Sequence, residues 1–206
     1  MPSRNRIKAY APDSYYHIYN RGVEKRQIFL DDQDYAVFLS LLKRYLSGED
    51  YKDHLGRVYE DLSAEVELLA FCLMPNHFHL LLYQSTEQGM TRLLRRAMTS
   101  YSMYFNRKYK RVGTLFQDRF KASRITENEY LQHISRYMHL NPKDYKTWEF
   151  SSLSYYFDHK KAKWLKPDKI LGMFTPGEYK KFMTDYEDHK KVMDELKYEL
   201  ANSSEL

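Results

Sequence analysis

Two histidines separated by one residue are the side chains of this sequence with the clearest potential for chemistry. They occur as His77-Phe78-His79 inside the apolar stretch Phe71–Tyr83. Because successive side chains of a β-strand point to opposite faces, both imidazoles are expected on one face and Phe78 on the other. Two imidazoles on a rigid strand can bind one divalent cation. Since such a pair also arises by coincidence, other residues must support the metal site.

A second group of polar side chains is expected on a helix later in the chain. Thr126 and Glu129 form a T-x-x-E capping box, which predicts a helix that starts there and ends at Asn141, before a proline. Tyr137 and Asn141 lie one turn apart beside the apolar stripe of this helix. A tyrosine there can bury its ring and leave its hydroxyl in a site, and the amide oxygen of Asn141 suits a hard cation. The residue before a proline tends to leave helical geometry, so the direction of Asn141 stays open.

Basic charge is concentrated in one segment. From Arg92 to Arg124 there are ten basic residues and one acid, Asp118, whereas the whole chain carries a net charge of +5. Tyrosines and phenylalanines are interleaved, and this combination is typical of proteins that bind single-stranded or hairpin nucleic acid. The alternative is that the charges only solvate a helix face. The residues predicted to bind DNA are Arg21, Arg26, Arg92, Arg95, Arg96, Arg107, Lys108, Arg111, Arg119, Lys121 and Arg124.

Composition indicates a soluble globular protein. The 206 residues, 43% hydrophobic and 30% charged, are enough for one domain with an appendage. No apolar run approaches the length of a membrane span, and Met1–Arg6 lacks the apolar segment of a secretory signal. We therefore expect a cytoplasmic, nucleoid-associated protein without membrane contact, in which the single Cys72 is a buried thiol.

The predicted elements alternate in a recognisable order. It is strand, helix, strand, strand, helix, strand, which is the ferredoxin-like split βαβ arrangement of an α+β fold with an antiparallel sheet. The catalytic helix follows the last strand, and a helical C-terminal extension follows that helix. Because this fold serves many functions, it does not name one. The strands are expected at Tyr15–Asn20, Val66–Met74, His77–Tyr83 and Phe120–Ile125, and the helices after Asp31-Asp32, from Thr91 and after Thr126.

Several motifs together resemble a known family. His77-Phe78-His79 resembles the histidine-hydrophobe-histidine motif of the HUH nucleases, and Tyr137–Pro142 resembles the tyrosine helix of their single-tyrosine transposases. The group that the chain resembles most is the REP-associated tyrosine transposases. Further motifs in the right order are Tyr16–Gly22, Tyr104–Arg107, Gly113–Phe120 and Trp148–Ser152.

The resemblance implies an activity and a domain division. It implies that His77, His79 and Asn141 bind Mg²⁺ or Mn²⁺ and that Tyr137 is the nucleophile, which would form a 5′-phosphotyrosine with single-stranded or hairpin DNA. Asn141 stands where insertion-sequence relatives often have glutamine, so its reach is one methylene shorter. Residues 1–157 would form the transposase-like domain and residues 158–206 the extension. A homodimer is left open.

Two other functions remain open at this stage. One is a domesticated nucleic-acid-binding protein that no longer cleaves. The other is a zinc hydrolase in which His17 or His139 joins the histidine pair; on a helical wheel His139 should face away from Tyr137. In the C-terminal part, Glu178–Leu200 is expected to form one or two amphipathic helices that cover the core rather than clamp DNA.

Overall fold

A computed structural model describes residues 10–185 of the 206-residue chain. Its centre is a four-stranded antiparallel sheet in the order β4-β5-β1-β6. The predicted α+β fold with a ferredoxin-like strand order is thereby confirmed. The strands are β1 (Ser14–Arg21), β4 (Val66–Met74), β5 (His77–Gln84) and β6 (Lys121–Ile125).

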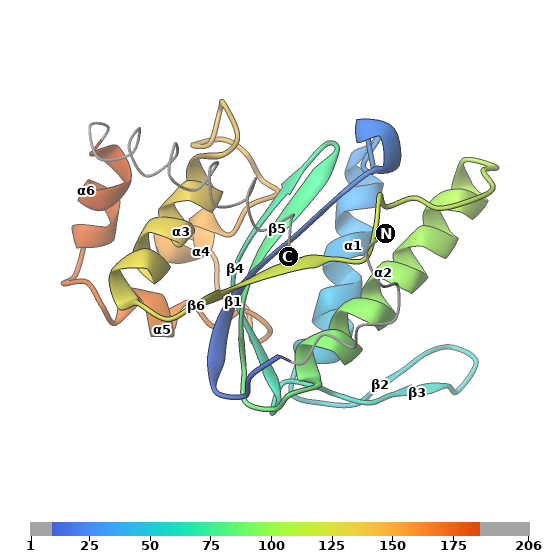
Figure 1. Cartoon of the computed structure of the whole chain (residues 1–206), viewed down its shortest axis with the longest axis horizontal. Helices are drawn as coiled ribbons and strands as arrows, with labels where there is room; N and C mark the ends of the chain where they lie inside the picture. Colours follow the sequence, from blue (N-terminus) through green and yellow to red (C-terminus); the bar gives the residue numbers. More distant parts are fainter. Residues whose placement is uncertain (1–9, 186–206) are drawn as a thin grey trace, which may run out of the picture.

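Helices cover both faces of this sheet (Figure 1). One face carries α1 and α2, and the other carries α3 with the shorter helices that follow it. No helix within residues 10–185 is long and apolar enough to cross a membrane. The helices are α1 (Asp32–Leu46), α2 (Gly89–Lys108), α3 (Asn128–Leu140), α4 (Leu153–Tyr156), α5 (Asp168–Leu171) and α6 (Glu178–Thr184), and η1 (Val23–Lys25) is a 3-10 turn.

The polar connection predicted between the first helix and the second strand contains a small hairpin. It is formed by β2 (Tyr51–Lys52) and β3 (Val58–Tyr59), which pair with each other and lie outside the main sheet.

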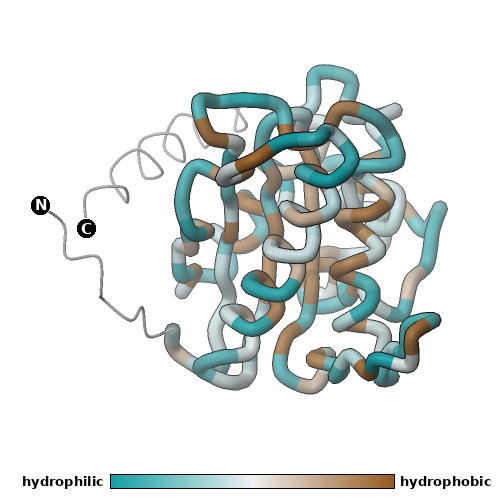
Figure 2. The backbone as a smooth tube through the Cα atoms, turned by 90° about the vertical axis from the view of Figure 1, so that its right-hand side faces the viewer, coloured by the Kyte–Doolittle hydropathy of each residue, from teal (hydrophilic) through white to brown (hydrophobic). Residues whose placement is uncertain are grey.

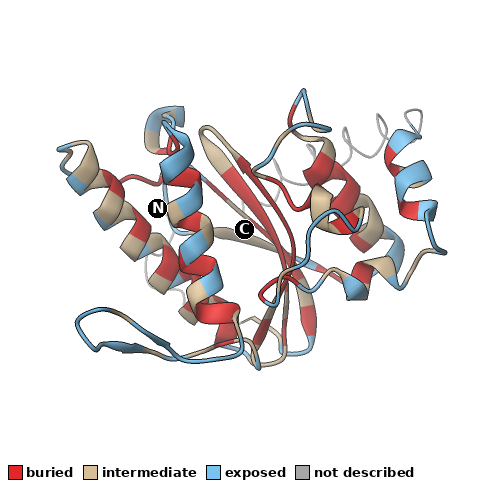
Figure 3. Ribbon diagram, turned by 180° about the vertical axis from the view of Figure 1, so that it is seen from behind, coloured by how far each residue is buried: buried red, intermediate tan, exposed pale blue. Residues whose placement is uncertain are grey.

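Successive side chains of β5 point alternately into two hydrophobic cores, one on each face of the sheet. Phe78, Leu80 and Leu82 belong to the core beneath α1 and α2, whereas Leu81 belongs to the core beneath α3. His77 and His79 therefore face α3. Figure 2 shows the hydrophobic strands at the centre of the molecule, and Figure 3 shows that they are buried.

The chain after α3 returns to the sheet and packs on it. Trp148 donates its indole N–H to the Leu73 carbonyl at 3.0 Å. The backbone of Ser151 forms an isolated antiparallel β-bridge with that of Cys72. The Cys72 thiol is buried, as expected. Tyr179 and Met183 of α6 are buried in the core beneath α3, so the described part of the amphipathic segment covers the core. The rest of Glu178–Leu200 lies outside the described residues, and the division at residue 157 stays a prediction.

The capping box predicted for α3 is wrong. The N-cap residue is Glu127, whose backbone is extended (φ −112°, ψ 135°) and whose side chain makes no capping hydrogen bond. The reason is that β6 continues to Ile125 and the chain is still extended at Glu127, so α3 starts at Asn128 and Thr126 lies before the cap position. Asp31 caps α1, since its carboxylate accepts from the Asp34 N–H at 3.0 Å.

Candidate active site

The two histidines lie on β5 at the edge of a polar cluster shared with β1. The rings of His77 and His79 are 5.0 Å apart and nearly perpendicular, at 88°. β1 runs beside β5 and places His17 and Tyr19 on the same face. His79 is only 4% exposed and His17 only 1% exposed. The cluster therefore sits beneath the helix layer formed by α3.

Tyr137 reaches this cluster from α3. Its ring lies 5.6 Å from the His79 ring and 6.3 Å from the His17 ring, and the residue is 7% exposed. Leu131, Ile134 and Met138 form the buried stripe that holds α3 on the sheet. The structure thus brings the candidate nucleophile and the histidine pair together from distant parts of the chain.

His139 faces away from Tyr137, as its helical position predicts. Its two ring nitrogens contact the Tyr179 hydroxyl at 2.8 Å and the Ser152 hydroxyl at 2.7 Å. Within residues 10–185, no group of three or more His, Cys, Asp or Glu residues is arranged to hold a metal ion. His139 therefore does not join the histidine pair, whereas His17 contacts His79.

Asn141 stays in helical geometry although a proline follows it. Its backbone angles are φ −60° and ψ −42°, against the expectation that the residue before proline leaves the helix. The side chain remains one turn from Tyr137, close enough to Tyr137 and His77 to shift the pKa of both. Asn141 thus lies near both the phenol and one of the two imidazoles.

Burial makes both imidazoles neutral at physiological pH. It lowers the pKa of His77 to about 4, with a smaller contribution from the positive charge of Arg21. The pKa of His79 is also well below its usual range, first because of burial and then because His17 and His77 are close. A neutral imidazole retains the lone pair that a cation needs.

Burial is the main influence on the pKa of Tyr137. Burial raises this pKa above the usual value near 10, and the hydrogen bond from Asn141 offsets only part of the rise. Near neutral pH the phenol therefore keeps its proton in the protein alone.

The donor set fits a divalent cation. Two neutral imidazoles from β5 and one amide oxygen from α3 offer three uncharged ligands. His79 contacts His17 through Nδ1 and His77 contacts Asn76 through Nδ1, so Nε2 is the ring nitrogen left for a cation in both cases.

An open pocket of about 460 Å³ adjoins this cluster. His77, His79 and Tyr137 form one side of it. Three of the basic residues predicted to bind DNA, Arg21, Arg119 and Lys121, form another part of the lining. A phosphate group that enters the pocket would therefore meet positive charge and the phenol together.

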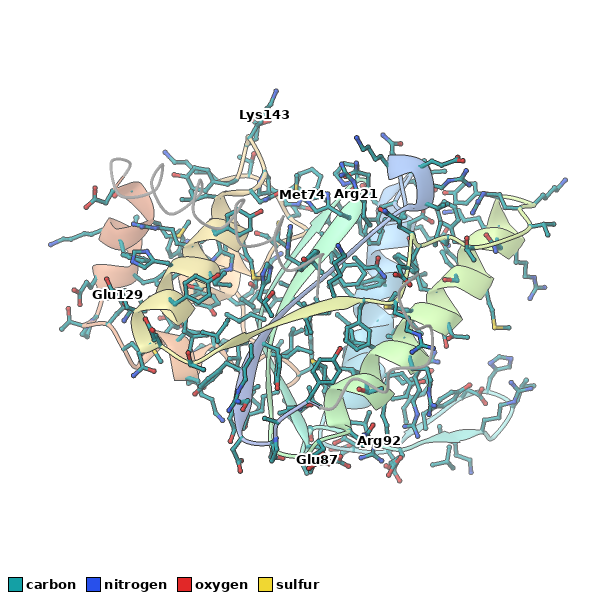
Figure 4. All side chains as sticks on the ribbon, in the orientation of Figure 1. Arg21, Met74, Glu87, Arg92, Glu129 and Lys143 are labelled. Carbon is teal, nitrogen blue, oxygen red and sulfur yellow. The ribbon has the colours of Figure 1, made fainter. Side chains whose placement is uncertain are left out.

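Several of the other predicted DNA-binding residues form ion pairs elsewhere. Arg92 pairs with Glu65 and Glu60, and Arg96 pairs with Glu60. Figure 4 shows Arg21 at one end of the sheet and Arg92 at the opposite end. The segment from Arg92 to Arg124 therefore does not form a single charged surface.

The remaining basic residues lie around α2, the loop after it and neighbouring segments. Lys108 pairs with Asp31 and Asp34, and the Arg111 guanidinium donates to Asn106 at 2.9 Å. Arg124 projects from β6 on the opposite face from Lys121. Three other predicted DNA-binding residues are exposed but do not line the pocket: Arg95, Arg107 and Arg124. Arg26 is partly exposed and pairs with Glu24.

The pocket also contains residues that the sequence did not single out. Tyr19 lines it with a second phenol, whose ring is 6.2 Å from His79. Asn20 donates to the Asp118 carbonyl at 2.9 Å and so ties β1 to the loop that carries Arg119. The two-residue period of β1 places Tyr19 on the face of His17, but only the pairing of β1 with β5 brings it to the pocket.

The fold and the site together combine a four-stranded antiparallel sheet, which carries the histidine pair, with a helix that carries a tyrosine. Residues 12–141 match the family described as IS200-like transposases, which is more than half of the chain. The chain belongs to this family, and it is accordingly a transposase, an enzyme that uses a tyrosine nucleophile. No curated protein matches the chain.

The solved structures that match this one include a REP-associated tyrosine transposase and a candidate transposase from another source. A REP-associated tyrosine transposase, solved bound to a REP hairpin, has 14% sequence identity and a TM-score of 0.52, with 79% of this chain and 90% of that chain covered. At this identity the likeness concerns the fold. A candidate transposase from Deinococcus radiodurans has 15% identity and a TM-score of 0.40, with 65% of this chain and 94% of that chain covered.

Proposed function

We propose that this transposase nicks and rejoins single-stranded DNA with hairpin ends, with Tyr137 as the nucleophile and His77, His79 and Asn141 as ligands of Mg²⁺ or Mn²⁺. The observation that carries the proposal is the position of Tyr137 against the histidine pair, with the ring centres of Tyr137 and His79 5.6 Å apart and Asn141 one turn along the helix from Tyr137. The hairpin as substrate is suggested by the similar transposase that was solved with a REP hairpin.

The proposed reaction is a transesterification at phosphorus. The Tyr137 hydroxyl loses its proton and its oxygen bonds to phosphorus, while the bond between phosphorus and the 3′ oxygen breaks. The 3′ oxygen takes up a proton, which leaves a free 3′-hydroxyl and a 5′-phosphotyrosine. Because the covalent bond keeps the reactivity of the phosphodiester, a second 3′-hydroxyl can reverse the step without ATP.

The residues around Tyr137 have separate tasks in this reaction. When bound, the cation would offset the negative charge that develops on the phosphate oxygens. Arg21, Arg119 and Lys121 would bind the DNA phosphates beside the phenol. The Asn141 amide, which lies close to the Tyr137 hydroxyl, would orient that hydroxyl.

The test is covalent capture of labelled DNA. The protein is incubated with 5′- and 3′-labelled hairpin-tailed single strands and Mn²⁺, and denaturing gels are used to detect an adduct. Tyr137→Phe keeps the buried ring and removes the attacking oxygen, so it should abolish the adduct. Tyr19→Phe removes the other phenol of the pocket, and Tyr15→Phe removes one from the same strand near Tyr83.

The outcomes separate the candidate functions. An adduct that survives Tyr19→Phe and Tyr15→Phe and disappears with Tyr137→Phe supports the proposal. An adduct that persists in Tyr137→Phe would assign the chemistry to another residue. Tight DNA binding with no adduct across a broad panel of hairpins would favour a protein that binds nucleic acid and does not cleave it.

A further inference from the structure

Both candidate metal-binding histidines contact a second polar side chain through Nδ1. The partner of His79 is His17, and the partner of His77 is Asn76. Neither partner is part of the pocket lining. The two contacts therefore lie outside the pocket lining.

The contact between His17 and His79 has the geometry of a direct hydrogen bond. His17 Nε2 and His79 Nδ1 are 2.9 Å apart, and the ring planes differ by only 17°. The ring centres are 5.1 Å apart, which is close to that distance plus the two ring radii, so the nitrogens point at each other edge to edge. With His17 at 1% exposure, the bond is shielded from water.

The orientation of Asn76 is fixed by the backbone. Its Nδ2 donates to the Lys25 carbonyl at 3.3 Å, which turns Oδ1 toward His77 Nδ1 at 2.6 Å. An amide oxygen only accepts, so the proton in this bond must be on His77 Nδ1. The Nε2 atom of His77 then carries the lone pair.

The two contacts decide which nitrogen can bind a cation. A neutral imidazole has one N–H and one lone pair, and the hydrogen bond made by one nitrogen sets the state of the other. We propose that His17 and Asn76 are positioning residues, which hold the protons of His79 and His77 on Nδ1 and thereby present both Nε2 lone pairs to the divalent cation. This inference rests on the proposed function, since that function supplies the cation.

Protein without metal or DNA provides the first test. Two-dimensional ¹H–¹⁵N spectra of the imidazoles distinguish a protonated ring nitrogen from one that carries a lone pair. In the wild-type protein both His77 and His79 should be protonated on Nδ1. A wild-type protein in which His79 carries its proton on Nε2 would overturn the inference, because His17 would then be the donor.

Variants of His17 provide the second test. His17→Leu removes the acceptor, so the His79 proton should redistribute toward Nε2 and the affinity for Mn²⁺, measured by titration calorimetry, should fall by about 10–100-fold. His17→Gln retains an oxygen that can accept from Nδ1, and it should restore the Nδ1–H form and most of the affinity. Tyr16→Phe is the matched control, since it removes the two hydrogen bonds with the Ala11 backbone from the opposite face of the same strand.

Asn76→Ala should act in the same way on the other ring. The His77 proton should redistribute, and Mn²⁺ affinity should fall while the Tyr16→Phe control remains at the wild-type value. If His17→Leu and Asn76→Ala both leave the proton positions and Mn²⁺ affinity unchanged, the inference fails.

The result can be separated from failure of the proposed function. If wild-type protein binds no Mn²⁺ and forms no adduct, the proposed function fails, whatever the proton positions are. If wild-type protein binds Mn²⁺ and forms the adduct, but His17→Leu does so equally well, only the role of His17 fails. Equal loss in His17→Leu and His17→Gln would also contradict the inference, because it would indicate that His17 acts other than as an acceptor.

Discussion

The rings of Tyr137 and His79 meet nearly at right angles, with their centres 5.6 Å apart and their planes at 82°. One ring comes from a helix and the other from a strand, so the contact depends on how α3 is seated on the sheet. One side of the helix packs on the sheet through Leu131, Ile134 and Met138. Another side is held by the hydrogen bonds of His139 with the Tyr179 and Ser152 hydroxyls. The position of the phenol is therefore a property of tertiary structure.

Asn141 should contribute strongly to strand cleavage and be dispensable for folding. Its side chain lies close to both His77 and Tyr137, and it is only partly buried. In Asn141→Leu the volume is similar but the amide is lost, so the rate of adduct formation should fall by about 10–100-fold. The measurement is a time course of adduct formation at saturating Mn²⁺, with circular dichroism to monitor the fold.

Asn141→Gln is the matched variant for that experiment. It keeps the amide and lengthens the side chain by one methylene, so its rate should lie between those of wild type and Asn141→Leu. A rate in Asn141→Leu that equals the wild-type rate would show that the amide takes no part in the reaction.

Arg119 should contribute more to DNA binding than Arg92. Arg119 is exposed and lines the pocket, whereas Arg92 pairs with Glu65 and lies at the other end of the sheet. A lost phosphate contact weakens binding and lowers the slope of log affinity against log salt concentration by about 1. Fluorescence anisotropy with a labelled hairpin, repeated over a range of salt concentrations, measures both quantities.

Arg92→Ala is the control, because it removes the same charge from a site with acidic partners. Its salt slope should equal that of the wild-type protein. The assignment of the pocket as the DNA-binding surface would be refuted if Arg92→Ala reduced the slope and Arg119→Ala did not.

Local periodicity was sufficient to predict much of the site. The two-residue period of a strand predicts that His77 and His79 share a face, and the helical period separates His139 from Tyr137. Both relationships depend on residues close in sequence, and both are present in the structure. The strand order followed from the same reasoning, since the elements were regular enough to be located from their apolar patterns.

Long-range relationships were not predictable in this way. Whether a lysine or arginine meets DNA or an acid depends on residues far along the chain, as in the pair of Lys108 with Asp34. The same holds for Tyr19, whose place in the pocket follows from strand pairing with β5. The false capping box at Thr126 has a different origin, because a local signal for a helix start was overridden by the extension of β6.

Gly22 should tolerate no side chain. A Cβ there would lie 2.2 Å from the Arg26 carbonyl oxygen, which cannot move away without distorting the loop after β1. The Gly22 N–H also donates to the Asn76 carbonyl at 2.9 Å, so a shift of this loop would reach the turn before His77. Gly22→Ala should reduce the free energy of unfolding by roughly 1–3 kcal/mol, as measured by urea denaturation.

Gly113→Ala allows the steric effect to be separated from backbone strain. A Cβ at Gly113 would meet no atom within 4 Å, but its φ of +94° disfavours any side chain. Gly113→Ala should therefore reduce the free energy of unfolding by about 1 kcal/mol, through backbone conformation alone. A loss in Gly22→Ala no greater than that in Gly113→Ala would indicate that the loop relaxes around the added methyl group.

The ion pair between Asp31 and Lys108 should make the stability of the α1–α2 contact depend on pH. The hydrogen bond from Lys108 is the main cause that lowers the pKa of Asp31 below its usual value. Since the folded pKa is lower than the unfolded one, the stabilisation is fully present above about pH 4 and is lost as the pH falls through the lowered value.

Asp31→Asn removes the charge and keeps a side-chain oxygen that can cap Asp34. Wild type should therefore have the higher melting temperature near neutral pH, the difference should disappear in strong acid, and added salt should narrow it at neutral pH. A difference that persists unchanged in acid would show that Asp31 stabilises the helix by capping geometry and not by its charge.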